Sequence, residues 1–300
     1  MKLMRAFVPL VLGALAFTVV ARADTPFPGM QITGDVFVMA HTVDANKALT
    51  NYFRPGSTVY FRSYAVDGKT RKLLTGKQVK YYYAKIPGAA NVKMVYSPRS
   101  PYATGRYRWI GRWAVPADYR LGIVYFGMLV KTKSKRNGIF HQTPVPSSQL
   151  TITQDPPAPW GPGPGQRGTV PRGNVNVALY ADTVNGTAPP GAVRRPIGCT
   201  QTNVYKRGER VVPRAWGFDL ATGDVLTIEN VMDARFSIAG QPDVRLDWGP
   251  HGPAANRVWF WTNFWIIPAN YPLGDAVIVV KFKLVDGKAG ALSLPITIVP

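Results

Sequence analysis

The chain has 300 residues, with 36 basic and 16 acidic side chains and a formal net charge of +20. Its length allows two domains of the usual size of roughly 100–150 residues, each able to bury a core. The single cysteine, Cys199, excludes a disulfide within either domain, so stability has to come from packing.

Residues 1–23 are predicted to be a cleaved secretory signal. Lys2 and Arg5 precede an apolar run from residue 7 to residue 20, and Ala21-Arg22-Ala23 matches a small-residue cleavage site. The apolar run is shorter than the roughly 20 residues that cross a bilayer, and no later run is longer. We therefore expect a mature chain without a transmembrane segment, periplasmic or extracellular after cleavage near Ala23.

Alternating and β-branched runs predict strands throughout the mature chain, whereas no segment has sustained helical periodicity. In the first half the predicted strands cover residues 34–41, 58–66, 78–85, 106–115, 122–133 and 150–152. In the second half they cover residues 173–180, 210–218, 225–236, 257–267, 275–284 and 291–299. Asn137-Gly138 and Asp286-Gly287 are typical of two-residue hairpin turns.

The two halves repeat one another. The segment WAVPADYRLG at 113–122 returns as WIIPANYPLG at 265–274, an offset of 152. A repeat of this length predicts two copies of one domain, at residues 24–153 and 173–300. The proline- and glycine-rich residues 154–172 between them predict a semi-extended linker, in which Trp160 is expected to pack into the seam between the domains. We therefore expect an all-β chain of two tandem immunoglobulin-like β-sandwiches.

The repeated Trp-x-x-Pro-Ala-x-Tyr-x-Leu-Gly segment, which runs into a strand in both copies, resembles the tandem immunoglobulin-like or fibronectin-like β-sandwiches of bacterial exported proteins. The likeness spans most of the mature chain but reaches only the level of a widespread fold, and the antibody-type cysteines are absent. It implies an interaction or scaffolding role by analogy.

Charge is unevenly shared between the copies. Residues 24–153 carry 19 basic and 5 acidic side chains, whereas residues 154–300 carry 14 and 11. The first copy is therefore predicted to face an anionic partner. The candidate partner-binding residues are Lys131, Lys133 and Lys135, expected on one strand face with Arg136 beside them, Lys69, Arg71 and Lys72 around a turn, Arg108 and Arg112 on an aromatic strand, and Arg194 and Arg195 in the second copy.

An acidic protein or an anionic envelope component is the expected partner, in a larger periplasmic or membrane-associated complex. The neighbouring Tyr81, Tyr82 and Tyr83 also suit single-stranded nucleic acid, which an exported protein seldom meets, so nucleic acid is not expected. A structural alternative is that the lysines only protect strand edges from aggregation.

The aromatic strands predict a second contact. Alternation places Trp259, Trp261 and Trp265 on the core face and Phe260 and Phe264 on the opposite face, where the first copy has arginines. Phe260 and Phe264 are therefore predicted to lie at an interface with the first domain, the linker or a partner.

The second copy carries an insertion. The opening strands begin at Gly34 and Gly173, an offset of 139, whereas the next strands keep the offset of 152. The difference of thirteen places the insertion within 185–205. This segment holds Cys199, which is free, buried or bridged to another chain, and a glycosylation pattern at Asn185.

A weak candidate metal pair lies in the first copy, where His41 follows Met39 on one strand face. No catalytic motif is present, and no cofactor is expected. The leading hypothesis is a non-catalytic, exported accessory or scaffold subunit that docks an anionic or membrane-associated partner through its basic first domain. The alternative is a module that binds carbohydrate or an envelope polymer. A third hypothesis is a metal carrier or an enzyme that uses His41 or Cys199.

Overall fold

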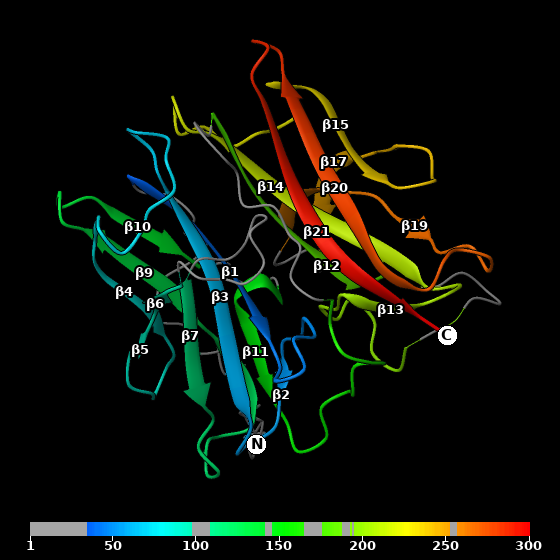
Figure 1. Cartoon of the computed structure of the whole chain (residues 1–300), viewed down its shortest axis with the longest axis horizontal. Helices are drawn as coiled ribbons and strands as arrows, with labels where there is room; N and C mark the ends of the chain where they lie inside the picture. The colour runs from blue at the N-terminus through cyan, green and yellow to red at the C-terminus, as the bar shows by residue number, and fades with distance from the viewer. Residues whose placement is uncertain are drawn as a thin grey trace, which may run out of the picture.

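A computed structural model describes residues 35–97, 109–141, 146–164, 176–187, 193, 195–252 and 257–300. They form two β-sandwiches that lie side by side, the first on the left in Figure 1 and the second on the right. The prediction of an all-β chain of two tandem immunoglobulin-like sandwiches is confirmed. Within the described ranges there is no α-helix, and so no helix long and apolar enough to cross a membrane. The predicted signal, residues 1–23, lies outside those ranges.

The first sandwich contains eleven strands and one short 3₁₀ turn in its described part. They are β1 (Val36–Val43), β2 (Tyr52–Phe53), β3 (Thr58–Asp67), β4 (Val79–Lys85), β5 (Val92–Lys93), β6 (Val95–Tyr96), β7 (Trp109–Ala114), β8 (Gly122–Tyr125), β9 (Gly127–Thr132), β10 (Asn137–Phe140), η1 (Pro146–Ser148) and β11 (Gln149–Ile152). One sheet has the order β1-β3-β7-β6. The facing sheets have the orders β10-β9-β4-β5 and β2-β11-β8.

The second sandwich repeats this plan with longer strands. Its strands are β12 (Val177–Asn185), β13 (Val204–Lys206), β14 (Arg210–Asp219), β15 (Val231–Ile238), β16 (Val244–Arg245), β17 (Asp247–His251), β18 (Val258–Thr262), β19 (Trp265–Ile266), β20 (Gly274–Leu284) and β21 (Ala289–Val299). One sheet has the order β12-β14-β18-β17, with β19 also paired to β14, and the other the order β13-β21-β20-β15-β16.

Core contacts recur at the offset of the repeat. The ring of Trp113 meets Tyr119 edge-on at 5.0 Å, and Trp265 meets Tyr271 in the same way at 5.0 Å. Gly138 packs against the β1 backbone and Gly290 against the β12 backbone so closely that an added Cβ would clash. The repeated segment is therefore similar in both copies because it supplies the same core contacts in each sandwich.

The turns are also equivalent. Asp67 pairs with Arg136 in the first copy, and Asp219 pairs with Lys288 at 2.6 Å at the matching positions of the second. Each carboxylate also accepts a backbone N–H of its own turn. These ion pairs link the turn after β3 or β14 to the turn before β10 or β21, so they belong to the fold.

Several sequence-based boundaries are wrong. Asn137-Gly138 lies inside β10, and the turn falls earlier, at Lys135, which takes the positive φ of 67°. The strand expected at 225–236 begins only at Val231. Register places Val177 opposite Asp219 as Val36 lies opposite Asp67, so the opening strands align at an offset of 141 rather than 139.

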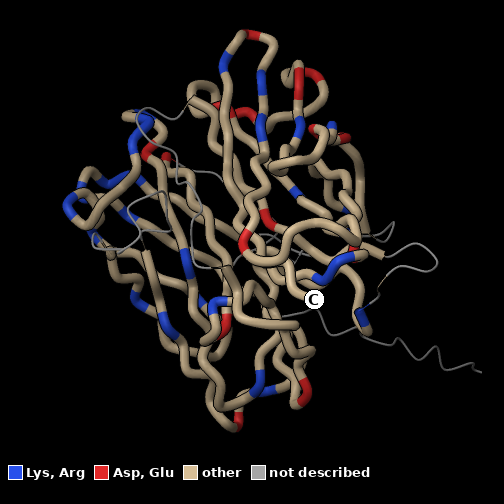
Figure 2. The backbone as a smooth tube through the Cα atoms, turned by 45° about the vertical axis from the view of Figure 1, so that its right-hand side comes forward, with Lys and Arg blue, Asp and Glu red and all other residues tan. Residues whose placement is uncertain are grey.

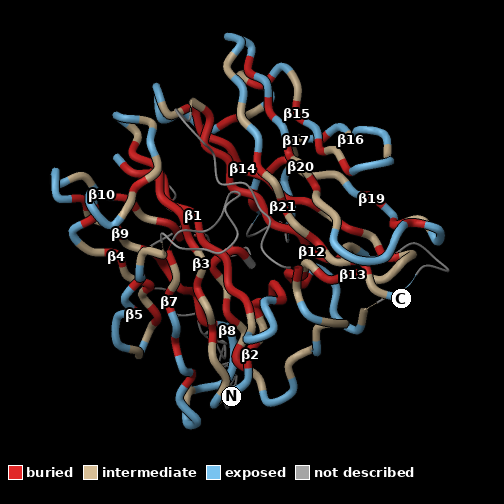
Figure 3. Tube along the Cα trace, in the orientation of Figure 1, coloured by how far each residue is buried: buried red, intermediate tan, exposed pale blue. Residues whose placement is uncertain are grey.

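Strands β1 and β12 meet at the seam between the sandwiches, and every residue of both is buried (Figure 3). The side chains of the first sandwich donate to carbonyl oxygens of β12: Tyr64 Oη lies 2.7 Å from the oxygen of Leu179, and His41 Nε2 lies 2.9 Å from that of Ala181. A strand edge that would otherwise expose unpaired groups is thereby covered.

A row of aromatic rings crosses the seam. Phe140 of the first sandwich meets Tyr180 at 5.3 Å between ring centroids, and the row continues through Trp216 at 5.4 Å to Phe260 at 5.1 Å. His41 stacks on Tyr180 from the side of the first sandwich. The row thus extends from the first sandwich into the second, and large rings of this kind bury much apolar area.

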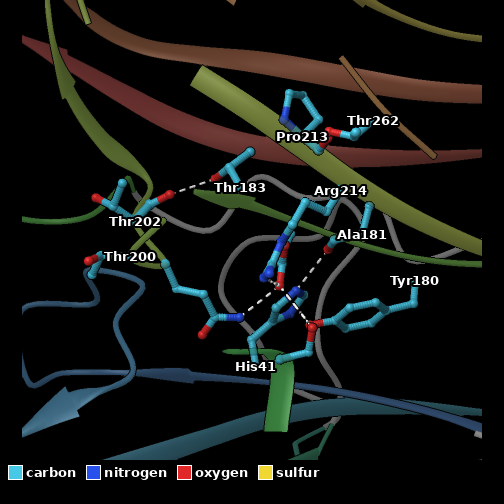
Figure 4. Close-up of polar contacts among 12 residues, drawn as sticks. His41, Tyr180, Ala181, Thr183, Thr200, Thr202, Pro213, Arg214 and Thr262 are labelled. Carbon is cyan, nitrogen blue, oxygen red and sulfur yellow. Dashed lines mark hydrogen bonds and ion pairs between the residues drawn. The ribbon is translucent and has the colours of Figure 1, made fainter. Parts of the chain in front are cut away.

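A buried ion pair lies beside this row (Figure 4). Arg214 Nε and Nη2 donate to the two carboxylate oxygens of Asp182 at 2.8 and 2.5 Å. Gln201, Tyr180 and, from η1 of the first sandwich, Ser147 donate to the same carboxylate. Burial alone would raise the pKa of Asp182, but Arg214 and these hydrogen bonds hold that pKa below its usual value. The ion pair thus joins both sandwiches.

Replacement of Asp182 by Asn is expected to destabilise the protein by about 3–5 kcal/mol, because Arg214 would keep a buried charge without its partner. The matched control is Asp233→Asn, which breaks the solvent-exposed pair with Arg235 and should cost much less. Chemical denaturation measures both. Equal losses in the two variants would contradict the structural role of the buried pair.

Candidate functional site

The exposed side of the sheet β10-β9-β4-β5 carries a cluster of tyrosines, lysines and aliphatic residues. Its side chains alternate with the core residues of the same strands, so Tyr82 points inward while its two neighbours point outward. The rings of Tyr81 and Tyr83 stack on each other, with centroids 5.5 Å apart. We call this surface the tyrosine–lysine face; it consists of Tyr81, Tyr83 and Lys85 of β4, Lys93 of β5, Leu129 and Lys131 of β9, and Ile139 of β10.

The pairing of the strands fixes the lysines around the tyrosines. Lys131 lies directly opposite Tyr81, and Lys93 lies opposite Tyr83. Every residue of the tyrosine–lysine face is exposed or half-buried. Neither Lys93 nor Lys131 forms an ion pair with any residue that the structure describes. Hydrogen-bond donors and positive charge therefore dominate this face.

The same surface of the second sandwich has different chemistry. Asp233 and Arg235 occupy the positions of the two tyrosines and form an ion pair at 2.7 Å. Asp243 adds a second carboxylate to Arg235, at 3.7 Å. Lys281 and Ala291 stand where the first sandwich has Leu129 and Ile139. Since both copies fold alike, the fold itself does not require the tyrosines.

More cations gather at one end of the first sandwich, near the turns after β3 and β9 (Figure 2). The prediction that Lys131, Lys133 and Lys135 share a strand face is wrong, because β9 ends at Thr132 and the two later lysines lie in the turn. Lys133 and Lys135 are nevertheless exposed, as are Lys69 and Lys72.

The candidate arginines are mostly held by the protein itself. Arg136 pairs with the buried Asp67, and Arg71 donates to Asn176 of the second sandwich at 2.7 Å. Arg195 pairs with the buried Glu209 at 2.7 Å and lies over the ring of Trp160 at 4.7 Å. These three arginines thus stabilise the fold, and the linker tryptophan packs on the second sandwich. Arg108 and Arg194 lie outside the described residues.

Arg112 opens onto a groove of about 950 Å³ at the edge formed by β5, β6 and β7. Its guanidinium lies 5.4 Å from the ring centroid of Tyr60. The groove is also lined by Asn91, Lys93 and Tyr96. Because Lys93 belongs to the tyrosine–lysine face as well, the groove continues that face around the sheet edge.

The two candidate phenylalanines have different surroundings. Phe260 is buried at the end of the aromatic row that crosses the seam, and the ring contacts described for it, with Trp216 and His251, lie within the second sandwich. Phe264 is 43 % exposed, and the Arg210 guanidinium lies 4.0 Å from its ring centroid. Trp259, expected in the core, is 50 % exposed near the start of β18 and packs on Trp248.

His41 and Met39 are both buried at the seam. Burial lowers the pKa of His41, which a hydrogen bond to Ala181 and the charge of Asp182 only partly offset. No three His, Cys, Asp or Glu side chains lie close enough together to hold a metal ion, within the ranges that the structure covers. His41 packs at the seam, where it donates to the carbonyl of Ala181 and stacks on Tyr180.

The insertion of the second copy is held by Asn185. Its side-chain carbonyl accepts the N–H of Thr200 at 2.7 Å, and its amide donates to the carbonyl of Ile197 at 2.9 Å. That amide is buried and hydrogen-bonded, so it is not accessible to glycosylation in the folded protein. Cys199 is exposed on this loop with a positive φ of 57°.

Sequence reasoning missed the network around Asp182 and Arg214. The repeat held a signal, because Arg62 and Arg214 occupy equivalent positions. Each of them lies opposite a polar residue of its opening strand, His41 for Arg62 and Asp182 for Arg214. His41 and Asp182 therefore occupy equivalent positions of the two opening strands. These two different polar groups lie on opposite sides of the seam, where the charge of Asp182 acts on His41.

No protein-family model matches the chain, and no curated protein matches it by sequence. Solved structures give only distant likenesses to β-rich proteins. A Bacteroides ovatus mixed-linkage glucan utilization protein, SGBP-B, in complex with a heptasaccharide, is 10 % identical over 83 % of this chain and 43 % of its own, with a TM-score of 0.19. Latent PorU from Porphyromonas gingivalis is 12 % identical over 87 % and 24 %, with a TM-score of 0.25. The C-terminal domain of Streptococcus agalactiae BspA is 9 % identical over 87 % and 99 %, at 0.20. The chain spans less than half of the first two proteins.

The free energy of unfolding is expected to fall as the pH drops from 7 to 5. Burial lowers the pKa of His41 and of His141, so the unfolded chain takes up protons near the ordinary value of 6.5 that the folded chain does not take up. Each such histidine contributes a slope of up to about 1.4 kcal/mol per pH unit. His41→Gln should flatten this dependence in denaturation measured at several pH values. Identical slopes for both proteins would show that His41 does not titrate in this way.

Phe260→Ala is expected to cost about 3–5 kcal/mol, because the aromatic row would lose a buried ring. Phe264→Ala, which removes the same ring from an exposed position just before β19, should cost far less. Thermal and chemical unfolding of the full chain check both. Similar losses would mean that Phe264 is as much a packing residue as Phe260.

Proposed function

We propose that this protein is a non-catalytic, exported accessory or scaffold subunit whose first sandwich docks an anionic partner through the tyrosine–lysine face. One observation carries the proposal. The face combines stacked tyrosines with Lys93 and Lys131, which form no ion pair with any described residue, whereas its counterpart in the second sandwich has an internal ion pair at the tyrosine positions. Residues that the fold does not require are the ones available for function.

The chemistry of the face favours an acidic partner. Lysine ammonium groups donate hydrogen bonds and carry positive charge, and tyrosine hydroxyls also donate. Carboxylate, phosphate and sulfate groups accept such bonds, and charge-assisted bonds are the stronger ones. None of the seven residues of the face is acidic. An acidic protein or an anionic envelope component therefore fits it.

The edge groove supports an extended partner rather than a small one. It connects Lys93 of the face to Arg112 around the end of the sheet. An extended acidic chain that follows this path would meet cations along its length. Such a contact gains affinity from many weak interactions and weakens as salt screens them.

A carbohydrate or envelope polymer is the second candidate partner. Two exposed aromatic pairs favour it: Tyr81 with Tyr83 on the first sandwich, and Trp248 with the half-exposed Trp259 on the second. Aromatic rings with one open side suit amphipathic partners that combine apolar faces with hydroxyl groups. Binding of neutral polysaccharides that salt does not weaken would favour this candidate over the first.

His41 and Cys199 are the two residues considered for metal binding or catalysis, and their surroundings favour a binding role for the protein. His41 is buried at the seam, donates to the carbonyl of Ala181 within a packed interface, and stacks on Tyr180. Cys199 lies on an exposed loop of the second sandwich. A metal carrier or an enzyme that uses either residue stays the third hypothesis.

The double variant Lys93→Glu and Lys131→Glu is expected to leave an anionic resin at a much lower NaCl concentration than the unmodified chain. The matched control makes the same charge change at equivalent positions of the second sandwich, Arg245→Glu and Lys283→Glu. Because both variants have the same net charge, the difference between them measures the face alone.

Equal elution of the two variants would reject the tyrosine–lysine face as the docking surface. Elution that does not depend on salt, from about 0.1 M upward where the Debye length is about 10 Å, would reject an electrostatic contact altogether. Both variants should unfold at temperatures close to that of the unmodified chain, because all four positions are open to solvent.

A further inference from the structure

The end of the second sandwich exposes apolar residues that the fold does not need. Val225, Ile228, Met232 and Val285 are 42, 67, 54 and 65 % exposed. They lie on the loop before β15, at the start of that strand and on the turn between β20 and β21. The same segments carry three exposed carboxylates, Asp224 and Glu229 on the loop and Asp286 on the turn, where Asp286 pairs with Lys288 at 2.8 Å. We call this acidic and apolar surface the second tip.

Hydrogen bonds hold the second tip together. The side chain of Asn230 accepts the N–H of Thr227 at 2.7 Å and donates to the carbonyl of Val225 at 3.0 Å. Its backbone carbonyl accepts the N–H of Val285 at 3.1 Å, which joins the loop to the neighbouring turn. The exposed apolar side chains therefore project from a fixed frame.

The first sandwich has the same frame with opposite chemistry. Gln78 replaces Asn230: its side chain accepts the N–H of Thr75 at 2.9 Å, and its carbonyl accepts the N–H of Lys133 at 2.8 Å. At the offset of the repeat, Asp224 corresponds to Lys72, Glu229 to Lys77, Met232 to Lys80 and Val285 to Lys133. With Lys69 and Lys135, these four lysines form what we call the first tip, and all six are exposed.

Both tips lie at the same end of the molecule (Figure 1). Arg71, in the turn of the first tip, donates to Asn176, and the carbonyl of Asn176 accepts the N–H of Leu220, where the loop of the second tip begins. The two sandwiches are thus side by side and parallel, with one basic and one acidic end facing the same way.

We propose that two copies of this chain associate end to end about a two-fold axis, with the first tip of each copy on the second tip of the other. A two-fold interface uses the same patch on both copies, so the patch has to be complementary to itself. A patch that contains one basic and one acidic tip with the same backbone frame meets this condition. The two-fold axis then places each basic tip on the acidic tip of the other copy, so two equivalent contacts form. The aliphatic stems of the lysines cover the apolar residues of the second tip, and their ammonium groups reach the carboxylates around it.

The experiment measures the mass of the mature full chain by sedimentation equilibrium. A concentration-dependent dimer is expected at about 0.05 M NaCl, and its dissociation constant should rise by about tenfold or more at about 0.5 M NaCl. The first-tip variant, with Lys72, Lys77, Lys80 and Lys133 all changed to Glu, leaves only Lys69 and Lys135 against four glutamates and should abolish the dimer. The second-tip variant, Asp224→Lys with Glu229→Lys, should abolish it as well. Lys281→Glu with Arg245→Glu, two exposed positions farther along the outward face of the second sandwich and outside both tips, is the control and should leave the dimer intact.

Mixing separates the specific contact from general charge effects. The first-tip variant has two acidic tips and the second-tip variant has two basic tips, so each should repel its own kind. An equimolar mixture of the two should form a heterodimer, since each acidic tip then meets a basic one. The variant that combines all six substitutions, so that both tips are reversed, should dimerise again.

A monomer at every concentration in low salt, a dimer that survives either tip variant, or a mixture that stays monomeric would each overturn the proposal. Retention on an anionic resin through Lys93 and Lys131 is measured separately. Failure of the tip contact and failure of the proposed docking function are therefore distinguishable.

Discussion

The buried ion pair between Asp182 and Arg214 determines how the two sandwiches can pack. Two charges out of water are tolerated only when hydrogen bonds satisfy them fully. One of those bonds comes from Ser147 of the first sandwich, and His41 of that sandwich stacks on Tyr180 beside the pair. A slide of the first sandwich along β12 would break the hydrogen bond from Ser147 to the carboxylate and those from Tyr64 and His41 to β12. These polar contacts therefore favour one register of the seam, across which the rings of Phe140 and Tyr180 pack.

The seam also decides which surfaces remain available. It covers β1 and the outward side chains Tyr64 and His41 of the first sandwich, so the opposite sheet is left open to solvent. The tyrosine–lysine face lies on that open sheet. Both copies turn equivalent sheets toward the seam, and their opposite sheets, which carry the tyrosine–lysine face in the first copy and the ion pair of Asp233 with Arg235 in the second, stay open to solvent.

The sequence predicted the shared part of the structure best. Trp113 and Trp265 make equivalent core contacts because both sandwiches pack a tryptophan edge-on against a tyrosine at the same place. Local patterns were less reliable. Asn137-Gly138 looks like a turn, but Lys135 takes the left-handed conformation instead and the glycine serves close packing on β1. Phe260 was expected at an interface, because alternation within one strand cannot show that its ring meets Trp216 and His251 of the same sandwich. Arg136 and Arg195 looked available because their buried carboxylate partners are 69 and 14 residues away along the chain.

The central claim is that the outward faces of two equivalent sheets, and not their cores, carry the difference in function. An exchange of side chains tests it most directly. A full-length variant that places the residues of the second copy on the first face, Tyr81→Asp, Tyr83→Arg and Leu129→Lys, conserves the fold and raises the positive charge. Binding to an acidic polymer is measured by titration calorimetry at low salt. We predict that affinity falls despite the added charge, because the stacked tyrosines are lost. Unchanged or tighter binding would contradict the account and would leave net charge as the whole explanation.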